Sequence, residues 1–163
     1  MRKVTFDTTE RPDSPAVQFA LRTGWHVAYV SVSVREAAGT DFEVDLKPLN
    51  QIVESGVWGE SRWGQALWSG GSEALKLEEI LNIIANGSFP RDRSNLSDGQ
   101  RHQLRDAMIL SAHARDRRDV FVTGDQKAFI KGDRREKLEA VALTRILSAI
   151  QFIEEFGESE ADA

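Results

Sequence analysis

The chain has 163 residues, of which 40% are hydrophobic and 29% charged, and its formal net charge is −5. This length and composition predict one soluble globular domain with a core large enough to fold unaided. Cysteine is absent, which excludes disulfides, thiolate nucleophiles and cysteine-ligated metal sites. The sequence lacks a signal-peptide pattern and any apolar run of about 18 residues, so we expect a cytoplasmic protein with no membrane partner.

The first part of the chain predicts alternating strands and helices. The expected elements are a strand at 4–6, a helix from about 15 to 24, a strand at 26–30 and a short helix at 31–38. Asp13 or Ser14 is a suitable N-cap for the first helix, with Pro15 in its first turn. The order strand, helix, strand, helix favours a parallel sheet with right-handed crossovers.

The remaining elements are predicted from caps, turn residues and apolar runs. They are helices near 48–55 and at 73–86, a loop over 87–96, a long helix from Ser97 to about Arg117, a strand at 119–123, a short helix around 126–131, a strand at 140–143 and a last helix from Thr144 through Phe156. The clearest signal is Ser97-Asp98-Gly99-Gln100, which fits a capping box. Thr144 is the expected cap of the last helix.

Together these elements predict an α/β fold, a three-layer α/β/α sandwich with a central, mostly parallel sheet. We expect a single domain over residues 1–155, with an enlarged middle segment at about 40–95. Residues 156–163 form an acidic C-terminal segment, which we expect to be a flexible tail.

The charges are unevenly distributed along the chain. Residues 101–137 contain ten Lys or Arg against six Asp or Glu, whereas much of the negative charge lies in the last ten residues. The negative total argues weakly against a nucleic-acid partner, and the basic segment argues for one. The alternative that both segments are merely solvated faces stays open.

Four acidic residues are placed where a parallel sheet gathers its ligand sites. Asp7 and Asp125 follow the carboxyl ends of two predicted strands, and Glu36 lies in the helix after another. Asp106 lies three and four residues before Ile109 and Leu110, so its carboxylate shares an apolar helical face, where an unpaired charge is costly. Taken singly, a strand-end Asp is more often a helix cap or a turn former, Glu36 would be a surface helix residue, and Asp106 could pair with Arg105 or a neighbouring Arg.

Four converging carboxylates would repel one another, and a hard divalent cation such as Mg²⁺ or Mn²⁺ would relieve that repulsion. The hydroxyl groups of Thr8, Thr9 and Thr123 are placed to orient the carboxylates or a bound water. Such a site suits hydrolysis of a phosphodiester, because a metal activates water and neutralises phosphate oxygens.

At these positions the sequence resembles the PIN-domain nucleases, the family that includes VapC-type toxins. The similar segments are an opening strand ending in Asp, a strand and helix ending in Glu, a helix with an Asp-Ala pair and a closing strand with Thr-x-Asp: Val4 to Thr9, Val30 to Glu36, Leu104 to Ala114 and Val120 to Asp125. The resemblance covers roughly residues 1–40 and 97–155. The segment between them is longer and richer in Trp and Gly than in the compact toxins.

This resemblance implies a PIN-like fold and a Mg²⁺- or Mn²⁺-dependent ribonuclease, with Asp7, Glu36, Asp106 and Asp125 as metal ligands and catalytic residues and Thr8 and Thr123 in support. It also implies RNA as the substrate and raises a homodimer and an antitoxin protein as candidate partners. Candidate phosphate-binding residues are Arg105, Arg115 and Lys127.

Two other functions compete with the nuclease. A phosphohydrolase of the HAD type also begins with a strand ending in Asp, but usually has a second Asp where this chain has Thr9. A non-catalytic PIN-like scaffold would bind RNA or protein without cutting. A third hypothesis, a nuclease toxin inhibited by an antitoxin in its acidic crevice, would need a partner that the chain does not reveal.

Two further groups of residues admit a functional and a structural interpretation. Trp58, Trp63 and Trp68 suit either a stacking platform for single-stranded RNA or the packing of a loop on the core. His102 and His113 are eleven residues apart on the long predicted helix, a spacing that does not favour zinc.

Overall fold

The computed structural model describes residues 1–41, 49–57, 66–67 and 71–161. Its centre is a five-stranded, all-parallel sheet with the strand order β3-β2-β1-β6-β7. The strands are β1 (Lys3–Phe6), β2 (His26–Val30), β3 (Asn50–Ile52), β6 (Val120–Val122) and β7 (Arg145–Leu147). A separate two-stranded parallel sheet pairs β4 (Glu54–Ser55) with β5 (Ala66–Leu67).

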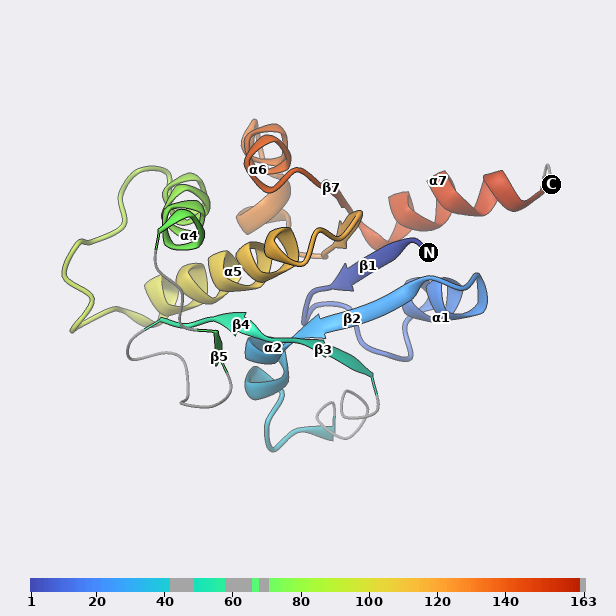
Figure 1. Ribbon diagram of the computed structural model, residues 1–163, viewed down its shortest axis with the longest axis horizontal. Helices are drawn as coiled ribbons and strands as arrows, with labels where there is room; N and C mark the ends of the chain where they lie inside the picture. The colour runs from blue at the N-terminus through green and yellow to red at the C-terminus, as the bar shows by residue number, and fades with distance from the viewer. Residues whose placement is uncertain (42–48, 58–65, 68–70, 162–163) are drawn as a thin grey trace.

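Helices cover both faces of the five-stranded sheet, which confirms the predicted three-layer α/β/α fold (Figure 1). One face carries α1 (Pro15–Arg22) and α7 (Ala149–Ala161). The other carries α4 (Ser72–Ile84), α5 (Asp98–Arg115) and α6 (Arg134–Ala142). The short helix α2 (Ser31–Glu36) follows β2, and a π-helical turn, η1 (Gln126–Ile130), follows β6. Among the parts of the chain described, no helix combines the length and apolarity needed to cross a membrane.

The two halves of the core follow from the alternation of side chains along the strands. Val120 and Val122 of β6 pack with α1 and α7, whereas Phe121 between them packs with α5 and α6. Successive residues of a strand point to opposite faces, so a strand buried on both sides is mostly apolar. The buried Thr5 of β1 is polar, and its hydroxyl has a hydrogen-bond partner in His113. The ring of Phe152 on α7 lies at the centre of one half, with its centroid 5.9 Å from that of Phe6.

The predicted helix near 48–55 is wrong. Its described part forms β3 and β4, and β3 extends the sheet by pairing Ile52 with Val30 of β2. Of the three residues of β3, Ile52 alone is buried, so the local pattern was too weak to distinguish an edge strand from a helix. The strand forms because a partner at the sheet edge satisfies its backbone groups.

The predicted strand at 140–143 is also wrong. Those residues end α6, whose last turn is followed by Leu143 in a left-handed conformation (φ 52°), and β7 begins only at Arg145. Thr144 therefore does not cap the last helix. That role belongs to Ser148, whose hydroxyl accepts from the Gln151 amide at 3.3 Å while the Gln151 side chain accepts from the Ser148 amide. The helix α7 continues to Ala161, so most of the expected tail is helical.

A buried ion pair fixes the short helix that carries Glu36. The carboxylate of Glu54 is fully buried and accepts from the Arg35 guanidinium at 2.8 Å. The Ser31 hydroxyl donates to the same carboxylate at 3.2 Å and accepts from the Glu54 amide at 3.0 Å. These contacts join both ends of α2 to β4. Breaking the pair would be costly, because it would leave an uncompensated buried charge.

Candidate active site

The order of the strands creates a crevice beside β1. From β1 the chain moves to β2 and β3 on one side, and later to β6 and β7 on the other. The connections after β1 and β6 therefore lead to helices on opposite faces of the sheet, α1 and α6, and a parallel sheet binds its ligands at such a switch point. Asp7 follows β1 directly, and its amide donates to the Val122 carbonyl at 2.9 Å, which holds the residue at the edge. Asp125 follows β6 two residues beyond Thr123.

All four predicted carboxylates line one hollow of about 510 Å³ at this edge. Asp7 and Asp125 come from the strand ends, Glu36 from the end of α2 and Asp106 from the middle of α5. The side chains of His102 and Arg105 also line it, one turn or less from Asp106 on the same helix. Segments far apart in sequence thus present their charges to a single space.

Asp7 is buried and its carboxylate is fully engaged in hydrogen bonds. One oxygen accepts from the Thr8 amide at 2.8 Å and from the Thr8 hydroxyl at 3.2 Å. The other accepts from the hydroxyls of Thr9 at 3.2 Å and Thr123 at 2.9 Å. Two carboxylate oxygens offer about four acceptor positions, so this arrangement uses all of them. Any additional ligand of Asp7 must replace one of these donors.

Thr123 joins the two strand ends. Its hydroxyl donates to Asp7 and accepts from the Asp125 amide at 3.0 Å, and its side chain is fully buried. A second link runs from the Gly124 amide to the Thr9 hydroxyl at 2.8 Å. A side chain at Gly124 would meet Thr9 at 3.3 Å, so glycine permits this close approach of the loops.

Asp125 both caps a helical turn and lines the hollow. One oxygen of its carboxylate accepts from the Ala128 amide at 2.8 Å and so caps the π-helical turn η1. This is the capping role that a lone strand-end Asp suggested. The residue nevertheless lines the same hollow as the other acids, so the cap orients the carboxylate without removing it from the site.

The acids perturb one another electrostatically. Burial, and then the charges of Asp7, Asp125 and Glu36, raise the pKa of Asp106 to about 9. Burial also raises the pKa of Asp7, against the lowering effect of its hydrogen bonds from Thr123 and Thr8. The pKa of Glu36 is raised by burial and lowered by Arg105, whose guanidinium lies 3.7 Å from its carboxylate. Near neutral pH the metal-free site therefore retains a proton on Asp106.

The chemistry of this donor set fits a hard divalent cation. Every predicted ligand offers carboxylate oxygens, and a cation would offset both the burial and the neighbouring charges that raise the pKa of Asp106. Within the described residues, however, no three Asp, Glu or His side chains are arranged to hold one ion as they stand. Binding would require the carboxylates to move closer, and Asp7 to exchange one of its hydroxyl donors.

The predicted phosphate-binding residues fall in different places. Arg105 lines the hollow, and Lys127 lines an adjoining one that shares Asp106 and Asp125. Arg115 lies ten residues further along α5, about 15 Å at the helical rise per residue. It donates to the Val53 carbonyl and lines a separate hollow with Arg117 and Asp119, which none of the four carboxylates lines.

Sequence reasoning missed Glu10 and gave no role to His102. The pKa of Glu10 is raised by burial and by the charge of Asp7, so a fifth carboxylate lies within electrostatic reach of the site. His102 lowers the pKa of Glu36 and lines both hollows beside Asp106. The spacing of His102 from Asp106 on a helix, one turn, was the signal that could have placed it.

His113 is a structural residue. Its ring nitrogens lie 2.9 Å from the Thr5 hydroxyl and 2.7 Å from the Thr144 hydroxyl, and the side chain is fully buried. Burial and the nearby Arg118 charge lower its pKa to about 3, so the ring is neutral. It ties α5 to β1 and to the start of β7. Trp58, Trp63 and Trp68 lie outside the described residues.

Replacing Thr123 with Val should destabilise the protein by roughly 1–3 kcal/mol, because a buried Asp7 oxygen loses its donor and the Asp125 amide loses its acceptor. Urea unfolding at neutral pH measures the change. Thr123→Ser is the matched control, since it keeps the hydroxyl and removes only a methyl group. Equal free energies of unfolding for the Val and Ser variants would contradict the bridging role.

A scan of the sequence against models of protein families finds no match, and searches of curated proteins and of solved structures find none either. The site must therefore be interpreted from its own chemistry.

Proposed function

We propose that the protein is a Mg²⁺- or Mn²⁺-dependent ribonuclease that hydrolyses RNA phosphodiester bonds at the four-carboxylate hollow. The observation that carries the proposal is the convergence of Asp7, Glu36, Asp106 and Asp125 on one hollow. The resemblance of the four short segments around them to PIN-domain nucleases supports RNA as the substrate. The raised pKa of Asp106, caused first by burial and then by the charges of Asp7, Asp125 and Glu36, supports a cation requirement, because a bound cation would favour the ionised form of this carboxyl.

The residues of the chain have separate tasks in this proposal. Asp7, Glu36, Asp106 and Asp125 would hold the metal, which supplies a lowered pKa for the attacking water and neutralises charge on the phosphate. Thr123 fixes the Asp7 carboxylate relative to β6. The Thr8 hydroxyl lies between Asp7 and Glu36 and interacts with both, so it is the donor most readily exchanged.

The cations beside the carboxylates suit the substrate. The Arg105 guanidinium lies 3.7 Å from the Glu36 carboxylate, a looser contact than a bidentate pair. A metal that neutralises Glu36 would weaken this contact and favour a contact between the Arg105 guanidinium and a phosphate. His102 is exposed at the rim of the hollow and offers a hydrogen bond to the same ligand.

A second candidate is a PIN-like scaffold that binds RNA or protein without cutting. It is favoured by the saturated hydrogen bonding of Asp7 and by the spacing of the acids in the described residues. In that case the carboxylates stabilise the surrounding loops through hydrogen bonds, as Asp125 does when it caps η1. Metal binding separates the two candidates, because only the nuclease needs it.

The deciding experiment is a titration of the purified protein with Mn²⁺, in which electron paramagnetic resonance follows the free metal. We expect saturable binding by the parent and its loss in Asp7→Asn and in Asp125→Asn, because each variant removes one charge from the donor set. Asp13→Asn is the matched control. Its carboxylate is exposed and pairs with Arg11 at 3.5 Å, so metal binding should be unchanged.

The outcomes assign the function in different ways. Loss in both site variants with retention in the control would support the metal centre. Absence of binding up to millimolar Mn²⁺, or binding that is equal in all four proteins, would overturn it in favour of the scaffold. A metal titration precedes any cleavage assay because the result does not depend on choosing the right RNA.

A further inference from the structure

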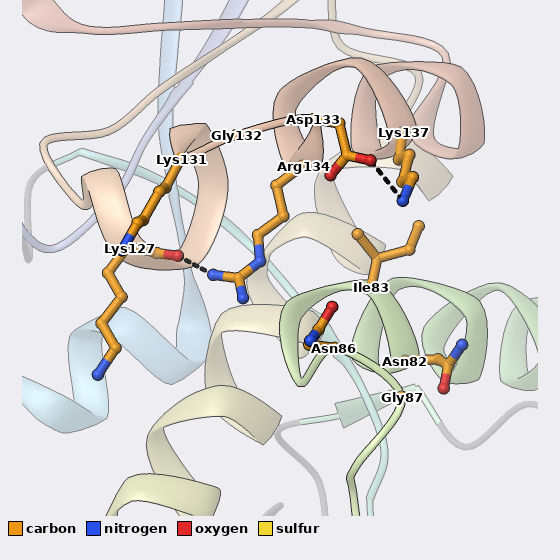
Figure 2. Close-up of a pocket in the computed structure, with 10 residues that line it drawn as sticks. All are labelled: Asn82, Ile83, Asn86, Gly87, Lys127, Lys131, Gly132, Asp133, Arg134 and Lys137. Atoms are coloured by element: carbon orange, nitrogen blue, oxygen red, sulfur yellow. Dashed lines mark hydrogen bonds and ion pairs between the residues drawn. The ribbon is translucent and has the colours of Figure 1, made fainter.

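The carboxylate hollow continues into two more hollows along the same side of the protein. The second, of about 490 Å³, shares His102, Asp106 and Asp125 with the first. The third, of about 640 Å³, shares Lys127 and Arg134 with the second. We call the third hollow the basic pocket. It lies between the end of α4, the turn η1 and the start of α6 (Figure 2).

The basic pocket has a positive lining. Four cations, Lys127, Lys131, Arg134 and Lys137, line it with a single acid, Asp133. Asp133 is already paired with Lys137 at 2.7 Å. Among the described residues, neither Lys127 nor Lys131 forms an ion pair. Both side chains are exposed. The lining therefore has a net positive charge that favours binding of an anion.

Arg134 shapes the floor of this pocket. Figure 2 shows its side chain reaching between η1 and α4, where one guanidinium nitrogen donates to the Lys127 carbonyl. A guanidinium has five donors in a fixed fork, so this bond fixes the group and leaves further N–H groups for a ligand. The contact also joins the turn η1, which contains Lys127 and is followed by Lys131, to the start of α6.

The opposite wall supplies amides rather than charges. Asn82 and Asn86 come from the last turn and the end of α4, and both are exposed. Between them Ile83 offers an apolar surface. Amide groups both donate and accept, and so can pair with the edge of a base, while apolar surface accommodates its face. Cations on one wall and amides on the other match a nucleotide better than an isolated inorganic anion.

We propose that the basic pocket binds the phosphate and base of a single-stranded nucleic acid next to the segment held at the carboxylates. The inference rests on the proposed nuclease function and adds a substrate path to it. A polyanion is repelled by four carboxylates, so binding energy must come from positive charge elsewhere along the strand. The shared residues of the three hollows give that strand one continuous course. Splayed bases need a single strand.

The test is fluorescence anisotropy of a labelled single-stranded oligoribonucleotide in EDTA, where no metal-dependent cleavage occurs. Removing one cation that binds a phosphate lowers the slope of log affinity against log salt by about 0.7. At roughly 0.1 M salt this corresponds to about fivefold weaker binding for each cation removed, so Lys127→Ala/Lys131→Ala should bind about 25-fold more weakly. Both side chains lie at the surface, so the double variant should keep its fold.

Arg22→Ala is the matched control, because Arg22 is an exposed cation on α1, on the other face of the sheet. Its affinity should equal that of the parent. Equal affinities for the double variant and the parent, or no binding by the parent at low salt, would overturn the path. Polyglutamate that displaces the oligonucleotide at equal charge would also overturn it and indicate an acidic peptide as the ligand.

The same proteins separate this inference from the function on which it rests. The double variant should bind Mn²⁺ as the parent does, because Lys127 and Lys131 are not ligands. Oligonucleotide affinity unchanged by the double variant, with Mn²⁺ bound by the parent and not by Asp7→Asn, would overturn the path and leave the nuclease intact. Weakened affinity in the double variant with no Mn²⁺ binding by any protein would support the path and overturn the nuclease.

Discussion

Asp106→Asn should stabilise the metal-free protein at neutral pH, by on the order of 2–4 kcal/mol. The pKa of Asp106 is raised from its ordinary 3.8 to about 9, first by burial and then by the charges of Asp7, Asp125 and Glu36. Between these two values the folded chain binds more protons than the unfolded chain. Its stability therefore falls as the pH rises from about 4 to about 9 and levels off above that. Asparagine never ionises, so the variant escapes this loss.

Thermal unfolding in EDTA at a series of pH values between about 5 and 9 measures the effect. The melting temperature of the parent should approach that of the variant at the acidic end and fall below it toward the basic end. Asp98→Asn is the control on the same helix. It removes a favourable charge from the α5 N-terminus and should slightly destabilise at every pH tested. A difference between parent and Asp106→Asn that stays constant with pH would contradict the raised pKa of Asp106.

Adding Mn²⁺ should reduce the stability advantage of Asp106→Asn over the parent, because the cation binds the charged acids of the folded parent. Ligand binding to the folded state alone stabilises by about 2.7 kcal/mol at a hundredfold excess over Kd. Asp106→Asn, with a weaker site, should gain less. The pH series and the Mn²⁺ series together measure how much the ionisation of Asp106 costs the folded protein and how much of that cost the cation offsets.

The second large effect concerns cleavage. Asp7→Asn and Asp125→Asn should each lower the rate of Mn²⁺-dependent RNA cleavage by roughly 10²–10⁴-fold, because each removes one ligand charge. The loss corresponds to about 3–5 kcal/mol of transition-state stabilisation. Asparagine keeps the shape of the side chain, and the neighbouring hydroxyls can turn to accept from its amide, so the fold should survive.

Digestion of a mixed pool of oligoribonucleotides, followed by electrophoresis, measures these rates without assuming a target. Asp13→Asn, an exposed acid outside the site, should cleave as the parent does. A parent that binds Mn²⁺ saturably but cuts no member of the pool would count against the ribonuclease. Equal cleavage by parent and both site variants would trace the activity to a contaminant.

The parallel sheet could be predicted because its central strands are apolar on both faces. Val4 to Phe6, the β2 residues and Val120 to Val122 are short buried runs bounded by turn residues, and the sheet needs them in that form. The start of the long helix could also be predicted, because both hydrogen bonds of the capping box at Ser97 join residues close together in the sequence. Elements that depend on neighbouring residues can therefore be predicted from a single sequence.

The misplaced elements depend on contacts between distant residues. β3 is a strand because β2 lies beside it, and nothing in Asn50 or Gln51 requires that. The run at 140–143 ends a helix because α6 packs on α4 and α5, which outweighs the β preference of Val141. In the hollow, strand ends indicated Asp7 and Asp125, whereas the position of Glu10 depends on loop geometry. His102 could have been placed from its helical spacing to Asp106. The basic pocket likewise joins segments that only the fold brings together.

The bond between Thr123 and Asp7 spans 116 residues, and it has a consequence for synthesis of the protein. A ribosome adds roughly 5–20 residues per second, so about 6–24 s pass between translation of the first carboxylate and the last. Until β6 emerges, the nascent chain holds only part of the hollow, and a prematurely terminated chain never completes it. If the protein is the proposed ribonuclease, such incomplete chains would lack the full set of metal ligands.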